Sequence, residues 1–389
     1  MVTGVDPHSF GAMRLKRLSF VFVPVLLAAG GVAGCKSETP DPAGSPSAAP
    51  SVSESAGAVE QGLNDLVASG VLVGGEAVLQ TGSGTESFTA GVGDRDTGAP
   101  YPEGGHTRVA SVTKAFTSVM VLQLAEEGLV DLDGTVEDYL PGLLADAGEG
   151  VEPDRITVRQ LLRHQSGLPE LEEPADPAAT YTPRELVALM GSQPAQYPPG
   201  EQMRYTNTNY VLAGILIEEI TGHRYIDELK TRIADPLGLT GTYLPEPGDV
   251  TLRAPSPKGY ALVDGVLTDV TAQEPSALYS SGGLVSNGAD LNRFFTALLA
   301  GEVVSAPMLD EMRETVPMTD VPGVGYGLGI MHLPVSCEVE AWGQAGDVPG
   351  FQAMVATTGD RTVSLLLDQS PSEQLGPGQL LGLLDAALC

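Results

Sequence analysis

Residues 109–118 read VASVTKAFTS, and they begin a helical pattern that runs to Gly128 and is apolar almost all round. A helix without a polar face is normally buried at the centre of a domain. Within this pattern Ser111 precedes Lys114 by three positions, so the two side chains share one helix face and the ammonium can approach the hydroxyl. The stretch therefore predicts a central helix with a candidate nucleophile at its N-terminus.

The chemistry of this pair follows from its surroundings. A serine at a helix N-terminus lies beside free backbone N–H groups and the positive end of the helix dipole, and both favour a developing oxyanion. Lys114 needs a partner or a function there, because burying an unpaired charge is costly. In an apolar environment a lysine also loses its proton more readily and can assist the attack of the serine. The Ser-x-x-Lys spacing alone is a weak signal, since serine is a common residue.

A second candidate is Tyr205-Thr206-Asn207, which precedes a helical pattern over residues 209–220. Asn207 and Thr208 are compatible with N-cap roles, and Tyr205 is compatible with a packed aromatic side chain. Taken alone, the segment favours the structural and the catalytic interpretation about equally.

Together the two motifs resemble the D-alanyl-D-alanine carboxypeptidases and class C β-lactamases, and the chain is most similar to the Streptomyces-type carboxypeptidase branch. The resemblance covers nearly everything from Val59 onward, and its motifs come in order at matching spacing. The similar stretches are VASVTKAFTS (109–118), ITVRQLLRHQSGLP (156–169), YPPGEQMRYTNTNYVLAGILIEEITG (197–222), ADPLGLTGT (234–242), SSGGLVSNGADLNRFFTALLAG (280–301) and YGLGI (326–330).

This resemblance implies a serine hydrolase that works through an acyl-enzyme on an amide or ester. Ser111 would be the nucleophile, and Lys114 and Tyr205 would share the proton transfers. Asn207 would position both the substrate amide and Lys114. Backbone N–H groups of Ser111 and Asp347 would form the oxyanion hole. No motif in the chain indicates a metal or another cofactor, and the expected partner is a small-molecule or peptide substrate.

The third family motif is where the sequence departs from the pattern. The family places Lys or His, then Thr or Ser, then Gly on the strand facing the serine, whereas this chain has Gln344-Ala345-Gly346, followed by Asp347. Gln344 can form hydrogen bonds but carries no charge. Met331 also stands where the carboxypeptidase branch has Arg. We therefore expect substrate-binding roles for Gln344, Gly346 and Asp347, with a neutral or cationic substrate in place of a C-terminal carboxylate.

Two alternatives stay open at this point. The rest of the pocket could compensate for the altered third motif, which would leave an ordinary D-Ala-D-Ala peptidase. The chain could also be a catalytically weak relative that binds penicillin or cell-wall peptides. His164, within the family-like LLRHQSGLP stretch, is interpreted as structural.

The expected fold is α+β, with an antiparallel sheet flanked by helices and a helical insertion. Strand patterns occur at both ends of the domain, and a mainly helical subdomain over residues 131–278 lies between them. The expected strands are residues 71–79, 86–92, 325–332, 351–358 and 362–369, and a final helix is expected over residues 379–388.

The N-terminal region carries the pattern of an export signal. A basic cluster precedes an apolar run, and residues 1–34 end in Val32-Ala33-Gly34 before Cys35, which resembles the bacterial lipobox. We expect cleavage before Cys35 and acylation of its thiol, which would tether the chain to the outer face of the membrane; plain secretion is the alternative. Pro, Ser and Ala dominate residues 35–57, which predicts a disordered tether before a hydrolase domain over 58–389.

Charge and cysteine content add two further expectations. The net charge of −30 disfavours nucleic acid as a partner, because phosphate contacts need Lys and Arg. Contact with the membrane is then expected only through the lipid anchor at Cys35. In an exported protein the two remaining cysteines, Cys337 and Cys389, most simply form a disulfide, and the carboxypeptidase branch has a similar pair.

Overall fold

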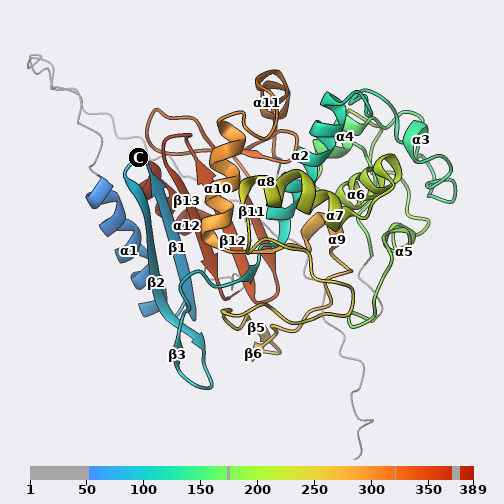
Figure 1. Cartoon of the computed structure of the whole chain (residues 1–389). Coiled ribbons are helices and arrows are strands. Elements are labelled where there is room, and N and C mark those ends of the chain that lie inside the picture. The colour runs from blue at the N-terminus through green and yellow to red at the C-terminus, as the bar shows by residue number, and fades with distance from the viewer. Residues whose placement is uncertain (1–51, 173–175, 320, 370–376) are drawn as a thin grey trace, which may run out of the picture.

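The computed structural model describes residues 52–172, 176–319, 321–369 and 377–389 (Figure 1). The predicted export signal, the lipidation site Cys35 and most of the predicted tether lie outside these residues. None of the helices within the described part is both long enough and apolar enough to cross a membrane.

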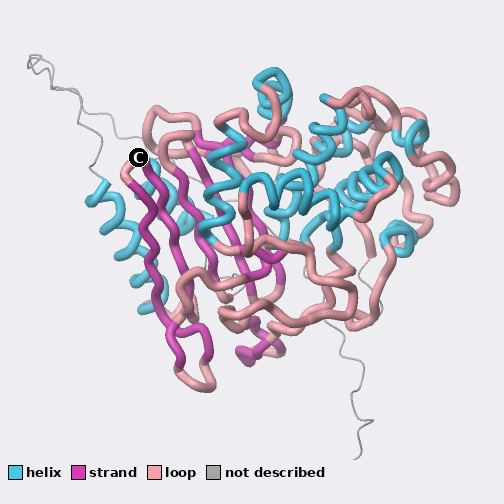
Figure 2. Tube along the Cα trace, in the orientation of Figure 1, coloured by secondary structure: helices cyan, strands magenta, loops and turns pink. Residues whose placement is uncertain are grey.

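A nine-stranded antiparallel sheet forms one side of the molecule, and a helical part forms the other (Figures 1 and 2). The strand order is β3-β2-β1-β13-β12-β11-β10-β9-β8. The bounds are β1 Gly74–Thr81, β2 Gly84–Asp94, β3 Ala99–Pro100, β8 Val316–Pro317, β9 Gly325–Tyr326, β10 Met331–Leu333, β11 Ala341–Val348, β12 Phe351–Thr357 and β13 Thr362–Leu367. The first hairpin of the chain thus pairs with its last strand, which confirms the expected α+β architecture.

Strand β13 is buried on both faces along its whole length. Val363, Leu365 and Leu367 belong to the apolar layer under the terminal helices α1 (Val52–Ala68) and α12 (Pro377–Leu388). Leu366 belongs to the opposite core, and Ser364 Oγ donates to Gly288 O of helix α10 (Gly288–Leu299) at 3.1 Å. The sheet is therefore the middle of three layers.

Helix α1 corrects the predicted boundary of the tether. The tether was expected to reach residue 57, but α1 begins at Val52. Ala56, Val59, Leu63 and Leu66 are all buried against the sheet layer at helical spacing. The Ser- and Ala-rich composition concealed this first turn, because neither residue type marks an apolar face strongly.

The predicted helical region over 131–278 consists of short helices joined by long loops, together with one hairpin. Thr135, Thr157 and Thr182 each begin a helix with a capping box. The elements are α3 Val136–Tyr139, α4 Val158–Leu162, α5 Pro183–Ala188, α6 Asn207–Thr221, α7 Tyr225–Leu229, the π turn η2 Lys230–Ala234, α8 Asp235–Leu237, β5 Tyr260–Val263 and β6 Val266–Asp269. The remaining elements are β4 Thr107–Arg108, α9 Tyr279–Gly282, β7 Val285–Ser286 and α11 Ala306–Arg313.

Two features of the fold carry over directly from the sequence. Helix α2 (Thr113–Glu126) is buried along nearly its whole length and packs against α6 and α9. Cys337 and Cys389 form the predicted disulfide, with an S–S distance of 2.03 Å. This bond fixes the residue after α12 to the loop between β10 and β11.

Candidate active site

Ser111 lies between the sheet and the helical part of the molecule. It occupies a 3-10 turn, η1 (Ala110–Val112), and α2 begins two residues later at Thr113, so the serine precedes the helix that was expected to start with it. Ala110 has φ of 47°, a left-handed conformation that a residue with a side chain rarely adopts. The sharp turn presents Ser111 at the end of a fully packed helix.

Lys114 Nζ is the centre of the site. It lies 2.9 Å from Ser111 Oγ, 2.8 Å from Asn207 Oδ1 and 2.7 Å from Ser281 O. A neutral amine has two N–H groups and one lone pair. Asn207 Oδ1 and Ser281 O can only accept, so they take the two N–H groups of the neutral amine. The lone pair then faces the serine hydroxyl, which is the arrangement of a base and its nucleophile.

The protonation of Lys114 follows from its burial. The side chain is fully enclosed, and this burial lowers the pKa of Lys114 to about 7, although the charge of Glu170 works in the opposite direction. A lysine with its ordinary pKa would be almost wholly protonated at neutral pH. Here about half of the molecules carry the neutral amine at pH 7, so Lys114 is poised to accept the proton of Ser111.

Tyr205 completes the proton-transfer group. Lys114 Nζ lies 4.8 Å from the centre of the Tyr205 ring. Burial of the hydroxyl raises the pKa of Tyr205 well above its ordinary value, with a further contribution from Tyr326, whereas the interaction of the tyrosine hydroxyl with Ser111 lowers the pKa of Tyr205. Tyr205 is therefore a phenol at neutral pH, suited to donate a proton to a leaving group.

The structure distinguishes between an N-cap role and a role beside Lys114 for Asn207. Thr206 is the N-cap of α6, because its hydroxyl accepts the Thr208 N–H at 3.3 Å. Asn207 is the first helical residue, and its side chain contacts Lys114 instead of capping the helix. The structure thus brings Ser111, Lys114, Tyr205 and Asn207 together, as the resemblance implied.

Strand β11 faces the serine turn. Strand β10 pairs with Ala341–Gly343 only, so the rest of β11 has β12 on one side and the Ser111 turn on the other. A Cβ atom on Gly346 would lie 2.5 Å from Ser111 N and 2.4 Å from Val109 O, so only glycine permits this approach. The open edge of the strand therefore lies where the backbone of Asp347 was expected to complete an oxyanion hole.

Gln344 of the third motif and Met331 are both buried side chains. Gln344 is buried, and its Nε2 donates to Gly329 O at 2.9 Å and to the Tyr326 hydroxyl at 3.3 Å. Met331 is buried in the layer beneath α1 and α12. Neither residue supplies a positive charge at this end of the site. The substrate-binding roles of Gln344, Gly346 and Asp347 stay predictions.

Glu170 belongs to the site although the sequence did not single it out. Its carboxylate accepts the Asn207 N–H at 2.9 and 3.1 Å and the Leu171 N–H at 3.0 Å. Burial of this carboxyl group raises the pKa of Glu170, and the two N–H groups and Lys114 oppose that effect. Its position directly after the quoted SGLP stretch was the only available signal.

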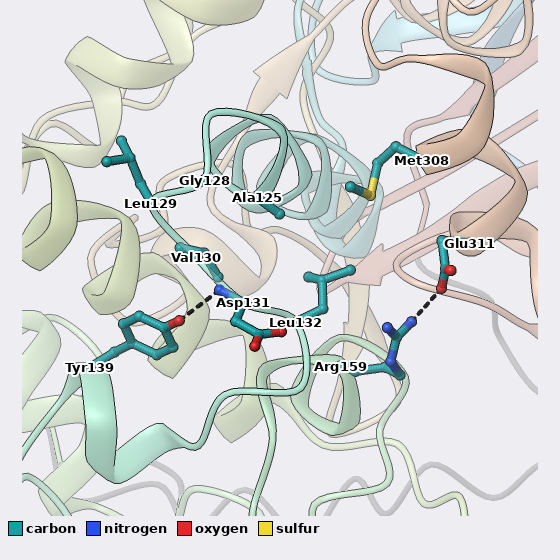
Figure 3. Close-up of a pocket in the computed structure, with 10 residues that line it drawn as sticks. All are labelled: Ala125, Gly128, Leu129, Val130, Asp131, Leu132, Tyr139, Arg159, Met308 and Glu311. Carbon is teal, nitrogen blue, oxygen red and sulfur yellow. Dashed lines mark hydrogen bonds and ion pairs between the residues drawn. The ribbon is translucent and has the colours of Figure 1, made fainter.

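A hollow in the described surface is remote from this group of residues. It has a volume of about 490 Å³ and lies at the C-terminal end of α2, between Ala125, Leu129, Met308 and the Arg159–Glu311 ion pair (Figure 3). Ser111 precedes the opposite end of the same helix. Within the described ranges there is also no group of three or more His, Cys, Asp or Glu side chains arranged to hold a metal ion.

The chain is similar to known proteins in sequence and in structure. The sequence family described as Beta-lactamase matches residues 59–379. Penicillin-binding protein 4* of Bacillus subtilis is 26% identical over 282 residues, which are 66% of this chain and 59% of that protein. Protein flp of Staphylococcus aureus is 30% identical over 173 residues, covering 43% of this chain and 34% of that protein. The chain thus spans less than two thirds of the length of these curated relatives.

Two solved structures are similar over most of their length. A D-stereospecific amidohydrolase from Streptomyces sp. has a TM-score of 0.78 and 34% identity, covering 86% of this chain and 98% of the other. The D-amino acid amidase of Ochrobactrum anthropi SV3, solved with D-phenylalanine, has a TM-score of 0.76 and 27% identity, covering 85% and 98%.

Proposed function

Because the chain belongs to the Beta-lactamase family, we propose that it is a serine amidohydrolase that cleaves amides of D-amino acids or of peptides with a free amino group beside the scissile bond. The assignment as a hydrolase rests on the position of Lys114 Nζ between Ser111 Oγ, Asn207 Oδ1 and Ser281 O. Burial there lowers the pKa of Lys114 to about 7.

Two half-reactions follow from the arrangement. Ser111 Oγ attacks the amide carbon while its proton passes to Lys114 Nζ, and the carbonyl oxygen becomes an oxyanion. The C–N bond then breaks as the phenol of Tyr205 protonates the departing nitrogen, and the proton held by Lys114 restores the phenol. Water cleaves the resulting ester by the same proton route, releasing the carboxylic acid and free Ser111.

The charges around the site support a substrate with an ammonium group. Lys or His and a neighbouring hydroxyl would favour a substrate carboxylate, but this chain has Gln344 and Ala345 at those positions. Glu170 contributes a carboxylate instead, bound to the first N–H of α6. An ionised carboxylate has about four acceptor sites, and the Asn207 N–H, the Leu171 N–H and the Thr206 hydroxyl are three donors to it, which leaves capacity for one ammonium donor. Preference for the D-enantiomer rests on the two similar enzymes whose names state it.

A set of four amides tests the proposal. D-phenylalanine amide should release ammonia fastest, with L-phenylalanine amide, N-acetyl-D-phenylalanine amide and a peptide ending in D-Ala-D-Ala as comparisons. Glu170→Gln should lower kcat/KM for the free-amine substrate by about 10- to 100-fold, since a charge-assisted hydrogen bond contributes about 1.5–3 kcal/mol. The N-acetylated substrate should change little. Glu172→Gln, the same charge change two residues away, is the matched control.

The outcomes separate the alternatives. Efficient D-alanine release with no response to Glu170→Gln would show a carboxypeptidase and refute the substrate assignment. Absence of Ser111-dependent labelling by both a fluorophosphonate and a fluorescent penicillin would indicate the catalytically weak binding relative instead. We also propose export with a lipid anchor at Cys35, which metabolic labelling with a fatty acid would test against a Cys35→Ala variant.

A further inference from the structure

His164 is a buried histidine that the mechanism above does not use. It follows helix α4 and has φ of 55°, so its backbone is left-handed. Its carbonyl accepts the Arg204 N–H at 2.9 Å and the Tyr197 hydroxyl at 3.2 Å. A left-handed residue with a side chain is costly and persists only where surrounding contacts determine it. Here those contacts tie the histidine to the segment that leads into Tyr205.

The ring nitrogen Nδ1 faces two donors. The Thr206 N–H lies at 3.2 Å, and Asn209 Nδ2 lies at the same distance. Ser166 Oγ donates to Asn209 Oδ1 at 2.6 Å, which fixes the amide so that its NH₂ points to the histidine. With two donors in front of it, Nδ1 must be an acceptor, so the imidazole is neutral with its proton on Nε2.

The face of the imidazole supports the proton-transfer group. Its ring centre lies 4.3 Å from that of Tyr205 with an interplanar angle of 31°, and 4.7 Å from that of Tyr326, which it meets edge on. Lys114 Nζ lies 4.8 Å from the same Tyr205 ring. Tyr205 is therefore packed against His164 while it also borders the amino group of Lys114.

We propose that His164 is a positioning residue for the reaction, acting through Tyr205 and Asn207. Thr206 is the residue between these two, and the hydrogen bond from its N–H to Nδ1 sets the spacing of both side chains around Lys114. The ring also packs against Tyr205, which restricts the positions that the phenol can take beside Ser111. This inference rests on the proposed function, since it assigns a role within the same hydrolytic site.

The neutral state of the histidine is part of this role. The titratable groups around it are Lys114, Tyr205, Tyr210 and Tyr326, and none of them offers a carboxylate to stabilise an imidazolium. Burial, and then the charge of Lys114, hold the pKa of His164 well below its ordinary value. A protonated Nδ1 would also face the Thr206 and Asn209 donors directly, so the ring stays an acceptor throughout the working pH range.

Two substitutions distinguish the effect of the Nδ1 hydrogen-bond acceptor from the effect of the aromatic ring of His164. His164→Asn keeps an acceptor near the position of Nδ1 but removes the ring, whereas His164→Phe keeps an aromatic ring and leaves the Thr206 N–H without its acceptor. We expect His164→Phe to lower kcat about 10- to 100-fold with KM within about threefold, because small displacements of catalytic groups have effects of this size. His164→Asn should recover part of the loss. The acid limb of the kcat/KM profile should also move in His164→Phe, since the surroundings of Lys114 change.

Leu384→Ala is the control for a merely structural effect. Leu384 is a fully buried residue of α12, in the layer on the other side of the sheet from α10. The Leu384→Ala variant should have a lower melting temperature, but the acid limb of its kcat/KM profile should stay at the wild-type pH. Equal kcat values for His164→Phe and wild type, or a loss shared by Leu384→Ala, would overturn the proposal. Fluorophosphonate labelling of the wild type is measured in parallel: an unlabelled wild type counts against the proposed function, and unchanged labelling of His164→Phe counts against this inference.

A measurement on the unmodified protein applies if His164→Phe does not fold. In ¹⁵N-histidine-labelled wild-type protein, one imidazole should stay neutral from pH 5 to 9 with its proton on Nε2. Its absence among the histidine signals, or a proton on Nδ1, would contradict the acceptor role.

Discussion

The most direct prediction concerns the pH dependence of Ser111 acylation. Burial lowers the pKa of Lys114 to about 7, and only the neutral amine has a lone pair to offer the serine hydroxyl. The rate of acylation should therefore follow the neutral fraction of Lys114. That fraction is about one half at pH 7 and about one hundredth at pH 5, so the rate should fall tenfold per pH unit in the acid range.

The assay is single-turnover labelling by a fluorophosphonate, because it reports acylation without deacylation or product release. Rates between pH 5 and 9 should fit one ionisation near pH 7 and reach a plateau above pH 8. Ser111→Ala should abolish labelling, and Lys114→Met should lower the plateau rate about 10²- to 10⁴-fold, as for loss of a general base. A labelling rate that still rises with pH above pH 9 would mean that Lys114 keeps its ordinary pKa. A rate independent of pH would show that another group takes the proton, and either result would refute the reasoning.

Three further predictions concern the architecture around the site. Gly346→Ala should abolish most activity and destabilise the fold by about 1–3 kcal/mol, because its Cβ would meet the backbone at Val109 and Ser111; chemical denaturation and labelling measured together would show whether the strand can shift at no cost. Burial raises the pKa of Asp368 to about 8, above the unfolded value of about 4. The folded state then binds more protons than the unfolded state between these two pKa values. The free energy of unfolding is therefore highest below pH 4 and falls by about 1.4 kcal/mol per pH unit as the pH rises to 8. Asp368→Asn should flatten that slope in melting curves, and an unchanged slope would exclude Asp368 as its source. Replacing Cys337 and Cys389 by Ser should lower the free energy of unfolding by ~4 kcal/mol for the loop they close, and denaturation that matches the wild type would contradict the chain-entropy account.

The sequence predicted the parts of the molecule that depend on local pattern. Helix α2 has no continuous polar face around Lys114, and β12 and β13 follow from predominantly apolar runs. Both were expected from residue order alone. The pairing of β1 with β13 was less accessible, because strand neighbours distant in sequence leave no local trace.

The candidate site also combines residues that local sequence predicts with residues that only the folded chain brings together. Ser111 and Lys114 share a local spacing, so their approach was predictable. Glu170 was missed because its role comes from an N–H at the start of α6, a contact that no spacing rule gives. The hydrogen bonds of the Gln344 amide to Gly329 and Tyr326 were not predictable either, and its substrate-binding role stays a prediction. Side-chain direction in a strand depends on register, which only the assembled sheet fixes.

The sheet order has a consequence for how the chain is made. β1 and β2 form the first hairpin, but the strand that completes the inner side of β1 is β13, which ends at Leu367. The chain must therefore be made through Leu367 before the central layer can close. Pairing over such a distance is slow, and the partly synthesised chain presents an unpaired strand edge meanwhile. The edge of β1 that β13 covers in the folded protein is thus the part of the nascent chain most open to wrong pairing.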